Sequence, residues 1–465
     1  MSAPAAPRQG EAVTLDITSV ASGGEGVGRS GDLVVFVPGA VPGDRVRARI
    51  AQMRPRYARA DLLTVERPSP DRRPPPCPVW QRCGGCPLMP LSPAAQRRHK
   101  RARLIEALAR IGGIAGVEVE EVLAAPAGPA GQPDLAYRAK AAMPVAAGPQ
   151  GPIVGFYGRG SHRLVEASAC PVTHPLARRV VAAVRDSLAP AGLAPYDEAT
   201  GRGEVRHIVV RVGVGTGESM AVVVTRSPRP PGLDRLAEEV TARLADLTCL
   251  AHSVQPEATN RILGRGPARV LAGRDGIRER VGPLTLHLSP TSFFQVNPAA
   301  AEVLYARAVA ELGPAGAGTV VDAHAGVGAI GLWAVAAGAE RAVGFETVAA
   351  AVADARRNAA MNGLSAEFSL GPAEILYRRR WPAGEGPDAV VLDPPRAGCP
   401  SALLEGLRSA PPARLVYVSC APETLARDLA RLTAGGRFRL ERVVPVDLFP
   451  QTAHLEAVAV LRRDR

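Results

Sequence analysis

The sequence predicts an α/β protein: a Rossmann-like parallel sheet, preceded by an OB-like β barrel and a central α+β region. From residue 286 onward, strand-like runs alternate with helical runs, which is typical of a parallel sheet. Residues 11–67 hold short strand-like runs between Gly and Pro turns, which favour a small barrel. We therefore expect three domains: a small barrel at 8–67, a central domain at 68–285 and an α/β domain at 286–465.

The barrel and the central region are predicted from short strands. Leu33-Val-Val-Phe-Val37 has the composition of a buried strand, and Pro38 to Gly43 has that of a turn. Residues 115–285 alternate strand-like runs with loops, and one helix is predicted among them, at 231–247. The barrel segment resembles a TRAM domain, which is an OB-like RNA-binding barrel.

The charge distribution indicates a polyanionic partner. The chain has a formal net charge of +12, and residues 1–110 contain 18 Lys or Arg against 9 Asp or Glu. A surplus concentrated in one module favours nucleic acid binding. No apolar run reaches the roughly 20 residues of a membrane span. Because the N-terminus also lacks the apolar core of a signal peptide, we expect a cytoplasmic protein with no membrane partner.

Three of the seven cysteines cluster in the Pro-rich segment after the predicted barrel. Cys77, Cys83 and Cys86 share one Gly/Pro-rich loop, which favours metal ligation over disulfides. Cys170, which is followed by proline, is the candidate fourth ligand. Zinc and an iron–sulfur cluster are both possible from thiolates, and the lack of a second cysteine knuckle favours a [4Fe-4S] cluster. Cys249 is expected to be a core residue.

A glycine-rich turn marks a cofactor site in the predicted parallel sheet. Gly326-x-Gly328 follows a strand that ends at Asp322, and Glu346 ends the next strand. The pattern fits a dinucleotide or S-adenosylmethionine, because both need close backbone approach and an acid on the ribose. Asp322 favours S-adenosylmethionine, since a carboxylate would repel a pyrophosphate but accept a hydrogen bond from the methionine ammonium. An NAD-dependent oxidoreductase remains the alternative.

Cys420 and Glu456 are the candidate catalytic residues. Cys420 follows the predicted strand 415–419, at the edge where open α/β sheets bind ligands; its alternative role is that of a small buried hydrophobe. Asp393 begins the loop Asp-Pro-Pro-Arg396, which resembles the substrate loop of methyltransferases. Methylating C5 of uracil requires a thiolate that adds to C6 and a base that removes the C5 proton. Glu456, in an otherwise apolar segment, is the expected base.

Together these motifs resemble the bacterial RNA uridine-5-methyltransferase family whose members carry a TRAM barrel and an iron–sulfur cluster. The motifs are Ser292-Phe-Phe-Gln295-Val-Asn297, Asp393-Pro-Pro-Arg-Ala-Gly398, Ser419-Cys420-x-Pro422-x-Thr-Leu-Ala-Arg-Asp428 and Phe449-Pro-Gln-Thr-x-His-x-Glu456. The resemblance implies a class I methyltransferase fold, S-adenosyl-L-methionine as methyl donor, Cys420 as nucleophile and Glu456 as base. It also implies that Gln295, His324, Glu346 and Asp393 bind the cofactor or frame the uracil. The implied cluster ligands are Cys77, Cys83, Cys86 and Cys170.

The implied partner is ribosomal or transfer RNA. The target uridine is expected to flip out of its stack in a loop or single strand. The protein is expected to be a monomer.

The chain departs from the family at three positions. The family usually has an aromatic residue at the position of His324, often Asn at the position of Ala421, and usually a polar residue at the position of Pro372. These departures concern cofactor contacts. A non-catalytic RNA-binding protein of the same fold is the second alternative; Cys420 and Glu456 argue against it, because a binding protein needs neither.

Overall fold

The computed structural model describes residues 7–128, 131–313 and 318–464. Residues 1–6, on which the expected lack of a signal peptide partly rests, lie outside the described residues. The chain divides into a barrel unit (Met1–Arg103, Tyr157–Val165 and Phe449–Leu455) and a sheet unit (Leu104–Phe156, Glu166–Leu448 and Glu456–Arg465). We describe each unit by itself. None of the described helices is both long enough and apolar enough to cross a membrane.

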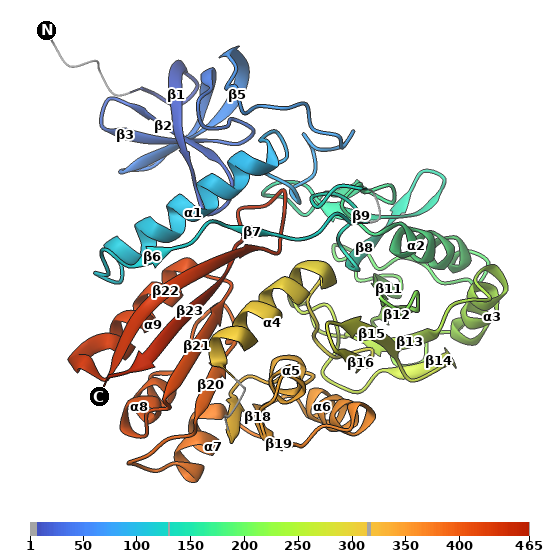
Figure 1. The fold of residues 1–465 in the computed structure, drawn as a ribbon. Coiled ribbons are helices and arrows are strands. Elements are labelled where there is room, and N and C mark those ends of the chain that lie inside the picture. Colours follow the sequence, from blue (N-terminus) through green and yellow to red (C-terminus); the bar gives the residue numbers. More distant parts are fainter. Residues whose placement is uncertain (1–6, 129–130, 314–317, 465) are drawn as a thin grey trace, which may run out of the picture. The chain divides into compact units, whose positions relative to one another are not determined.

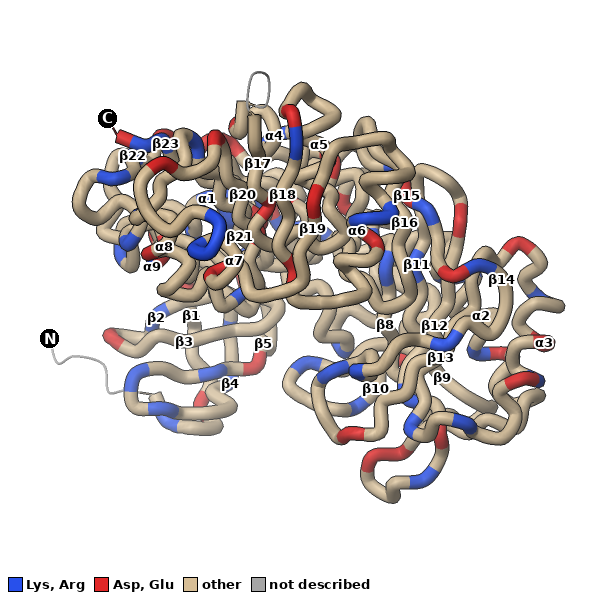
Figure 2. The backbone as a smooth tube through the Cα atoms, turned by 90° about the horizontal axis from the view of Figure 1, so that it is seen from below, with Lys and Arg blue, Asp and Glu red and all other residues tan. Residues whose placement is uncertain are grey.

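The barrel unit begins with a closed barrel, as the sequence predicts. Its strands have the order β1-β2-β3-β5-β4 (Figure 1). Along β4, Val46 and Ala48 are fully buried while Arg47 and Arg49 are exposed, because side chains alternate between the two faces of a strand. Figure 2 shows the basic positions along this strand. The strands are β1 (Ala12–Val20), β2 (Gly26–Ser30), β3 (Leu33–Val37), β4 (Arg45–Met53) and β5 (Tyr57–Arg67).

Helix α1 (Pro93–Arg110) anchors the segment that directly precedes Glu456 in the chain. Gln96 Nε2 donates to Gln451 Oε1 at 3.0 Å, and Gln96 Oε1 accepts from the Gln451 backbone N–H at 2.8 Å. The Lys100 ammonium donates to the Phe449 carbonyl at 3.0 Å. His454 packs edge-on against Phe449 with 5.9 Å between ring centroids. These contacts fix the course of residues 449–455 within the barrel unit.

The central part of the sheet unit is a mixed sheet in the order β9-β8-β11-β12-β13-β14, followed by a hairpin. Helices α2 (Pro175–Leu188) and α3 (Leu233–Arg243) pack on one face of this sheet (Figure 1). The strands are β8 (Lys140–Gly148), β9 (Gly151–Tyr157), β10 (Leu164–Glu166), β11 (Val205–Val212), β12 (Ser219–Thr225), β13 (Cys249–Val254), β14 (Arg269–Gly273), β15 (Ile277–Val281) and β16 (Leu284–Leu288).

Helix α3 corresponds to the helix predicted at 231–247, but α2 was not predicted. Its valines favour strands when each is considered alone. The buried residues Ala177, Val180, Val184 and Leu188 nevertheless recur at helical spacing and form one apolar face. His174 caps the helix, because its Nδ1 accepts from the Leu176 backbone N–H at 3.2 Å. Burial of that face against the sheet outweighs the local strand preference.

The C-terminal part of the sheet unit is the predicted α/β domain. Its sheet has the order β19-β18-β17-β20-β21-β23-β22-β6, with β17 to β21 parallel and β23 antiparallel to β21. The strands are β6 (Glu118–Val119), β7 (Leu123–Ala124), β17 (Thr319–Asp322), β18 (Arg341–Glu346), β19 (Ala366–Leu370), β20 (Ala389–Leu392), β21 (Arg414–Ser419), β22 (Phe438–Asp447) and β23 (Glu456–Arg463). The helices are α4 (Pro298–Leu312), α5 (Ala329–Ala336), α6 (Ala349–Asn362), α7 (Ala373–Arg380), α8 (Ser401–Ser409), α9 (Pro422–Thr433) and the 3-10 turn η1 (Ala434–Gly436).

The closing antiparallel pair, β22 and β23, differs from the sequence prediction in position. The strand-like runs 445–448 and 457–461 predict an antiparallel hairpin at the sheet edge. In the structure β23 lies between β21 and β22, and β22 extends from Phe438 to Asp447. β6 and β7 add to β22 in parallel, so β22 is not the edge strand. This pairing joins segments more than 300 residues apart in sequence, which local patterns do not predict.

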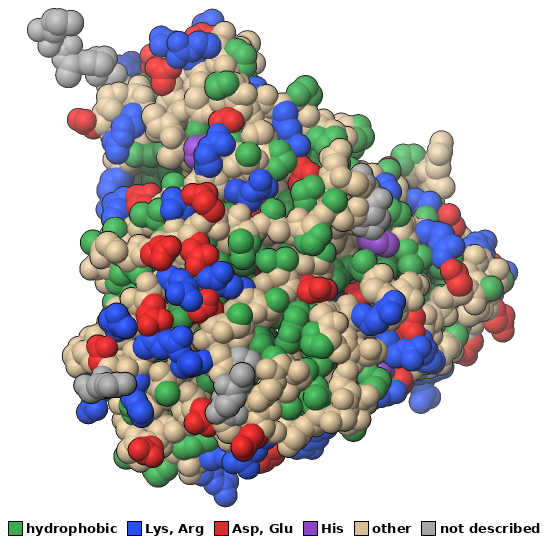
Figure 3. All heavy atoms as spheres, in the orientation of Figure 1, with side chains coloured by type: hydrophobic (Ala, Val, Ile, Leu, Met, Phe, Trp, Pro, Cys, Tyr) green, Lys and Arg blue, Asp and Glu red, His purple; other side chains and the backbone are tan. Residues whose placement is uncertain are grey.

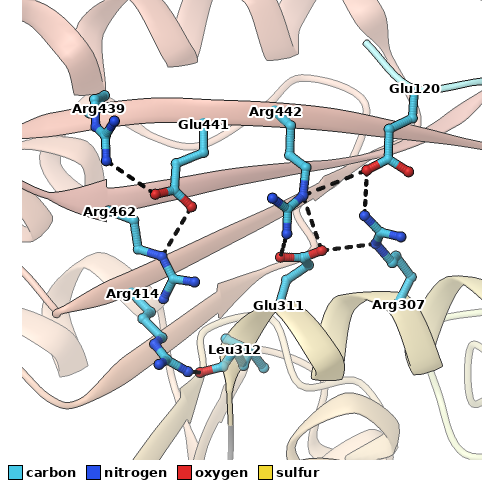
Figure 4. A network of polar contacts seen from close by, with 9 residues as sticks. All are labelled: Glu120, Arg307, Glu311, Leu312, Arg414, Arg439, Glu441, Arg442 and Arg462. Carbon is cyan, nitrogen blue, oxygen red and sulfur yellow. Dashed lines mark hydrogen bonds and ion pairs between the residues drawn. The ribbon is translucent and has the colours of Figure 1, made fainter. Parts of the chain in front are cut away.

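A charged network holds α4 against β22 (Figure 4). Arg442 on β22 donates to Glu311 on α4 at 2.6 Å, and Arg307 on α4 lies 2.9 Å from the same carboxylate. Glu120, which follows β6, pairs with both arginines. Glu311 is 6% exposed, so the network is better shielded from solvent than a surface ion pair. It fixes the orientation of α4, whose inner face carries Tyr305.

Candidate active site

The predicted site residues of the sheet unit meet at one edge of the parallel sheet. Asp322 and Glu346 end the neighbouring strands β17 and β18. Asp393 follows β20, and Cys420 follows β21. Because the carboxyl ends of parallel strands lie at the same edge, these side chains come together there.

The glycine turn after β17 is braced by two acids. The Gly326 N–H donates to Glu346 Oε2 at 3.0 Å, and the Gly331 N–H donates to Asp322 Oδ2 at 3.0 Å. Gly326 has φ +52° and Gly328 has φ +85°, in the left-handed region that favours glycine. A Cβ at Gly328 would lie 2.8 Å from the ring of Phe368. The turn therefore requires glycine at both positions.

Buried polar atoms without partners mark a ligand site beside this turn. Among the described residues, Asp322 Oδ1 and His324 Nδ1 have no hydrogen-bond partner. Burial, with a smaller effect of Glu346, raises the pKa of Asp322 to about 7. Burial lowers the pKa of His324 to about 4, so its imidazole is neutral at pH 7. A cationic ligand with hydrogen-bonding groups would satisfy these atoms, and S-adenosylmethionine carries both an ammonium and a sulfonium.

Cys420 and Glu456 face each other across the β21–β23 pair. Ser419 pairs with Ala457 in the antiparallel register, so Cys420, one residue later, lies opposite Glu456, one residue earlier. Cys420 is half-buried, whereas Glu456 is 2% exposed and its Oε2 has no partner among the described residues. No hydrogen bond from the described residues therefore stabilises this oxygen. Burying a carboxylate in this way destabilises the fold, so its presence indicates a functional role.

The pKa values of both groups are shifted upward. Burial, followed by the negative charges of Glu456 and Asp393, raises the pKa of Cys420 to about 11, and Arg396 opposes this shift. Burial and Asp393 raise the pKa of Glu456 well above its ordinary value, again opposed by Arg396. Arg396, from the Asp-Pro-Pro-Arg loop, is thus a positive charge near both groups. A raised pKa gives Glu456 a greater affinity for a proton, which suits a base.

Tyr305 on α4 belongs to the site but was not predicted. It is 5% exposed, and its hydroxyl bonds the side chain of the predicted residue Gln295. Burial, Asp393, Glu456 and Asp322 raise the pKa of Tyr305, so its hydroxyl stays protonated. A lone tyrosine in an alanine-rich helix was the available signal. Its relation to the sheet edge depends on tertiary packing, which the sequence pattern does not show.

The Cys420 thiol is expected to react with iodoacetamide in a strongly pH-dependent way. Since only the thiolate reacts and its pKa is about 11, the rate should rise about tenfold per pH unit between pH 7 and pH 9. Peptide mass spectrometry would measure the Cys420 peptide separately from the other cysteines. A rate that levels off near pH 7 would mean that the folded protein stabilises the thiolate, which would contradict the raised pKa of Cys420.

The predicted metal ligands are divided between the two units. Cys77, Cys83 and Cys86 belong to the barrel unit and Cys170 to the sheet unit. In the part of the chain that the structure describes, no group of three or more His, Cys, Asp or Glu residues is arranged to hold a metal ion. The structure therefore does not show the cluster, and its ligand set stays a prediction.

One arginine near the cysteine loop has buried donors that make no hydrogen bond among the described residues. The Arg159 guanidinium lies 5.2 Å from the ring centroid of Trp80. Its Nε and Nη2 are buried and have no hydrogen-bond partner among the described residues. Burial lowers the pKa of Arg159, while Cys83, Glu25 and Cys86 oppose this shift. An anionic group held by these thiolates would suit this guanidinium.

Comparisons with known proteins show which proteins this chain is similar to. Family models match residues 8–63, as a TRAM domain, and residues 387–464, as tRNA (Uracil-5-)-methyltransferase. An uncharacterized RNA methyltransferase of Halalkalibacterium halodurans is 37% identical over 463 residues, 99% of each chain. Another, of Gloeobacter violaceus, is 40% identical over 465 residues, 99% of this chain and 98% of the relative. The crystal structure of Pyrococcus abyssi tRNA (uracil-54, C5)-methyltransferase in complex with S-adenosyl-L-homocysteine has a TM-score of 0.76 and 27% identity, covering 96% of this chain and 99% of that one.

Proposed function

The chain belongs to the RNA (uracil-5-)-methyltransferase family with an N-terminal TRAM domain, and from this premise we propose that Cys420 and Glu456 carry its reaction. The protein is an S-adenosylmethionine-dependent RNA methyltransferase that acts on C5 of uracil. The observation that supports the assignment of residues is the register of β21 and β23, which sets a thiol opposite a buried carboxylate with an unbonded oxygen.

Each of the two residues has one role. The Cys420 thiolate adds to C6 of the uracil, and the electrons of the C5=C6 bond move toward C5 as an enolate. C5 then takes the methyl group, which S-adenosylmethionine supplies from its sulfonium. Glu456 accepts the proton from C5, the electrons of that C–H bond restore C5=C6, and the Cys420 sulfur leaves.

The cofactor would be held by the residues around the glycine turn. Asp322 and His324 offer the unpaired Oδ1 and Nδ1, and Glu346 ends the strand at which the ribose acid is expected. Gln295 and Asp393 lie nearer the reacting base, where an amide and a carboxyl side chain can frame a uracil. Gly326 and Gly328 allow close backbone approach. The family usually has an aromatic residue at the position of His324. In this chain the neutral imidazole of His324 offers a hydrogen bond to the cofactor instead.

The substrate is ribosomal or transfer RNA, with the target uridine flipped out of a loop or single strand. The exposed arginines of β4 support RNA binding by the barrel domain, 8–67, and the central domain, 68–285, would share this role with the catalytic domain, 286–465. Mapping 5-methyluridine in RNA from a strain without this gene tests the proposal. Loss at one position of ribosomal or transfer RNA would identify the substrate, and an unchanged 5-methyluridine map would contradict the function.

Cys77, Cys83, Cys86 and Cys170 are proposed to hold a [4Fe-4S] cluster. The all-thiolate donor set supports this assignment, as do the buried donors of Arg159 that have no hydrogen-bond partner among the described residues. None of the four residues takes part in the methyl transfer described above.

Protein purified without oxygen is expected to be brown and to bind iron and sulfide, at about four of each per chain. Cys83→Ser should lose the iron, because one of the ligands is removed. Cys249→Ala, which changes a buried thiol in β13, should keep it. Metal analysis and visible absorbance would measure both variants; one zinc per chain without iron would contradict the proposal.

A further inference from the structure

Two basic residues share one face of the central sheet, and a third lies just ahead of its strand β8. Lys140 on β8 pairs directly with Arg211 on β11 in the antiparallel register, and Arg138 precedes Lys140 by two residues. Residues that face each other in an antiparallel pair project to the same side, as do residues two apart along a strand. Their neighbours Ala139 and Val210 belong to the core on the opposite side, under α2 and α3. Lys140 and Arg211 therefore occupy the face that these helices leave uncovered. Arg138 lies just ahead of β8, close enough for its positive charge to lower the pKa of Lys140.

The positive charge of this group is incompletely balanced. Arg211 is 5% exposed; its Nη2 donates to the Ser292 carbonyl at 2.8 Å, but its Nη1 has no partner among the described residues. Arg138 Nε is buried and likewise unpartnered. Burial, Arg211 and Arg138 lower the pKa of Lys140 to about 7.

The nearby acids do not neutralise the whole group. Asp354 and Glu279 raise the pKa of Arg211, which is otherwise lowered by burial. Both acids already accept other bonds: Asp354 from the Ser289 N–H, and Glu279 from the backbone N–H groups of Val214 and Gly215. The charges that shift the pKa of Lys140 are those of Arg211 and Arg138, and both are positive. The two acids therefore do not offset the positive charge around Lys140. Burying unpaired cations is costly, so a fold that keeps them has a reason beyond stability.

The basic group contacts the loop that reaches the active site. Arg211 bonds the Ser292 carbonyl, and the Ala139 N–H donates to the Val296 carbonyl at 2.7 Å. Between these two attachment points lie Gln295, which enters the active site, and Phe293, which is 62% exposed. An anion bound by the basic group would thus lie beside the loop that frames the target base.

We propose that Arg138, Lys140 and Arg211 form a binding site for a backbone phosphate of the substrate RNA next to the target uridine. This proposal rests on the proposed function, because it takes RNA as the substrate. A phosphodiester supplies the missing negative charge and accepts hydrogen bonds from both guanidinium and ammonium groups. The face drawn in Figure 3 mixes basic and acidic side chains.

Salt-dependent RNA binding tests the site. The probe is a fluorescein-labelled oligouridylate of twelve nucleotides, titrated by anisotropy at pH 6.5, where Lys140 is protonated. In Lys140→Met the slope of log affinity against log salt should fall by about 0.7, the value for one lost phosphate contact on a single strand. Lys140→Arg keeps the charge and should keep most of the slope. Arg235→Ala removes an exposed charge from α3, on the covered side of the sheet, and should behave as wild type.

An unchanged slope in Lys140→Met would overturn the proposal, as would an equal loss in Arg235→Ala. If Lys140→Met fails to fold, judged by its binding of S-adenosylmethionine, Arg138→Gln takes its place with the same expected result. The proposed function fails separately, because it predicts a covalent Cys420–RNA adduct. If the Cys420–RNA adduct forms but the salt slope is unchanged in both variants, only the phosphate site is contradicted. If the salt slope falls but no adduct forms, only the proposed catalytic roles are contradicted.

Discussion

Replacing Cys420 by alanine is expected to lower methyl transfer by about 10⁴-fold or more, because the uracil C5 is not nucleophilic until a thiolate adds to C6. Transfer of a radiolabelled methyl group to RNA from a strain without the gene would measure this loss. The covalent protein–RNA adduct should disappear at the same time. The substitution leaves Glu456 and the glycine turn unchanged, so S-adenosylmethionine should still bind.

Two further cysteine variants serve as controls. Cys249→Ala changes a buried thiol of the central sheet and should retain the activity. Cys399→Ala tests another thiol of the α/β domain as nucleophile; its backbone N–H donates to buried Asp428 at 2.9 Å, and burial raises the pKa of its thiol to about 12. If Cys420→Ala kept its turnover while Cys399→Ala lost it, the nucleophile assigned here would be wrong.

Replacing Glu456 by glutamine is expected to stall the reaction after methyl transfer. The amide has the same shape as the carboxylate but does not accept the C5 proton, so the sulfur of Cys420 remains bonded to C6. Turnover should fall by about 10²–10⁴-fold, the usual contribution of a general base. A denaturation-resistant adduct should accumulate and be visible as a shifted band in a denaturing gel.

The same substitution should not weaken the fold. The pKa of Glu456 is raised in the folded protein, so its ionised form destabilises the fold at pH values above its ordinary pKa. Glu456→Gln removes that charge, and its melting temperature at pH 8 should equal or exceed that of wild type. Glu441→Gln on β22, which breaks a surface pair with Arg462, is the matched control and should neither stall the reaction nor form adduct. Normal turnover in Glu456→Gln would move the search for the base to Asp393.

Local sequence patterns predicted most of the sheet edge. Strands β17 and β21 were predicted from short β-branched runs, and Asp322, Asp393 and Cys420 follow from the rule that ligands bind at the carboxyl ends of parallel strands. The glycine turn was predicted from the spacing of its glycines after a strand and from the close backbone approach that a cofactor needs. The structure adds that Gly326 and Gly328 have left-handed backbone, which favours glycine. These features depend on residues that are close together in the chain.

Features that depend on distant parts of the chain were missed. Tyr305 enters the site only because α4 packs against the sheet, and Arg211 faces Lys140 only because β8 and β11 pair in one register. The addition of β6 to β22 has the same origin. Helix α2 was missed for a different reason: its valines have a strand preference that tertiary burial overrides. No pattern of residue types in the sequence reports such contacts directly.

The central claim is that Cys420 bonds to the target uracil and Glu456 releases it. Its most direct test uses RNA from a strain without the gene, grown with 5-fluorouracil, because fluorine at C5 is not removed as a cation. Wild-type protein and S-adenosylmethionine should give a stable adduct, and protease and nuclease digestion followed by mass spectrometry should find the methylated fluorouridine on Cys420. An adduct on Cys399, or methylation that proceeds with no adduct at all, would contradict this account.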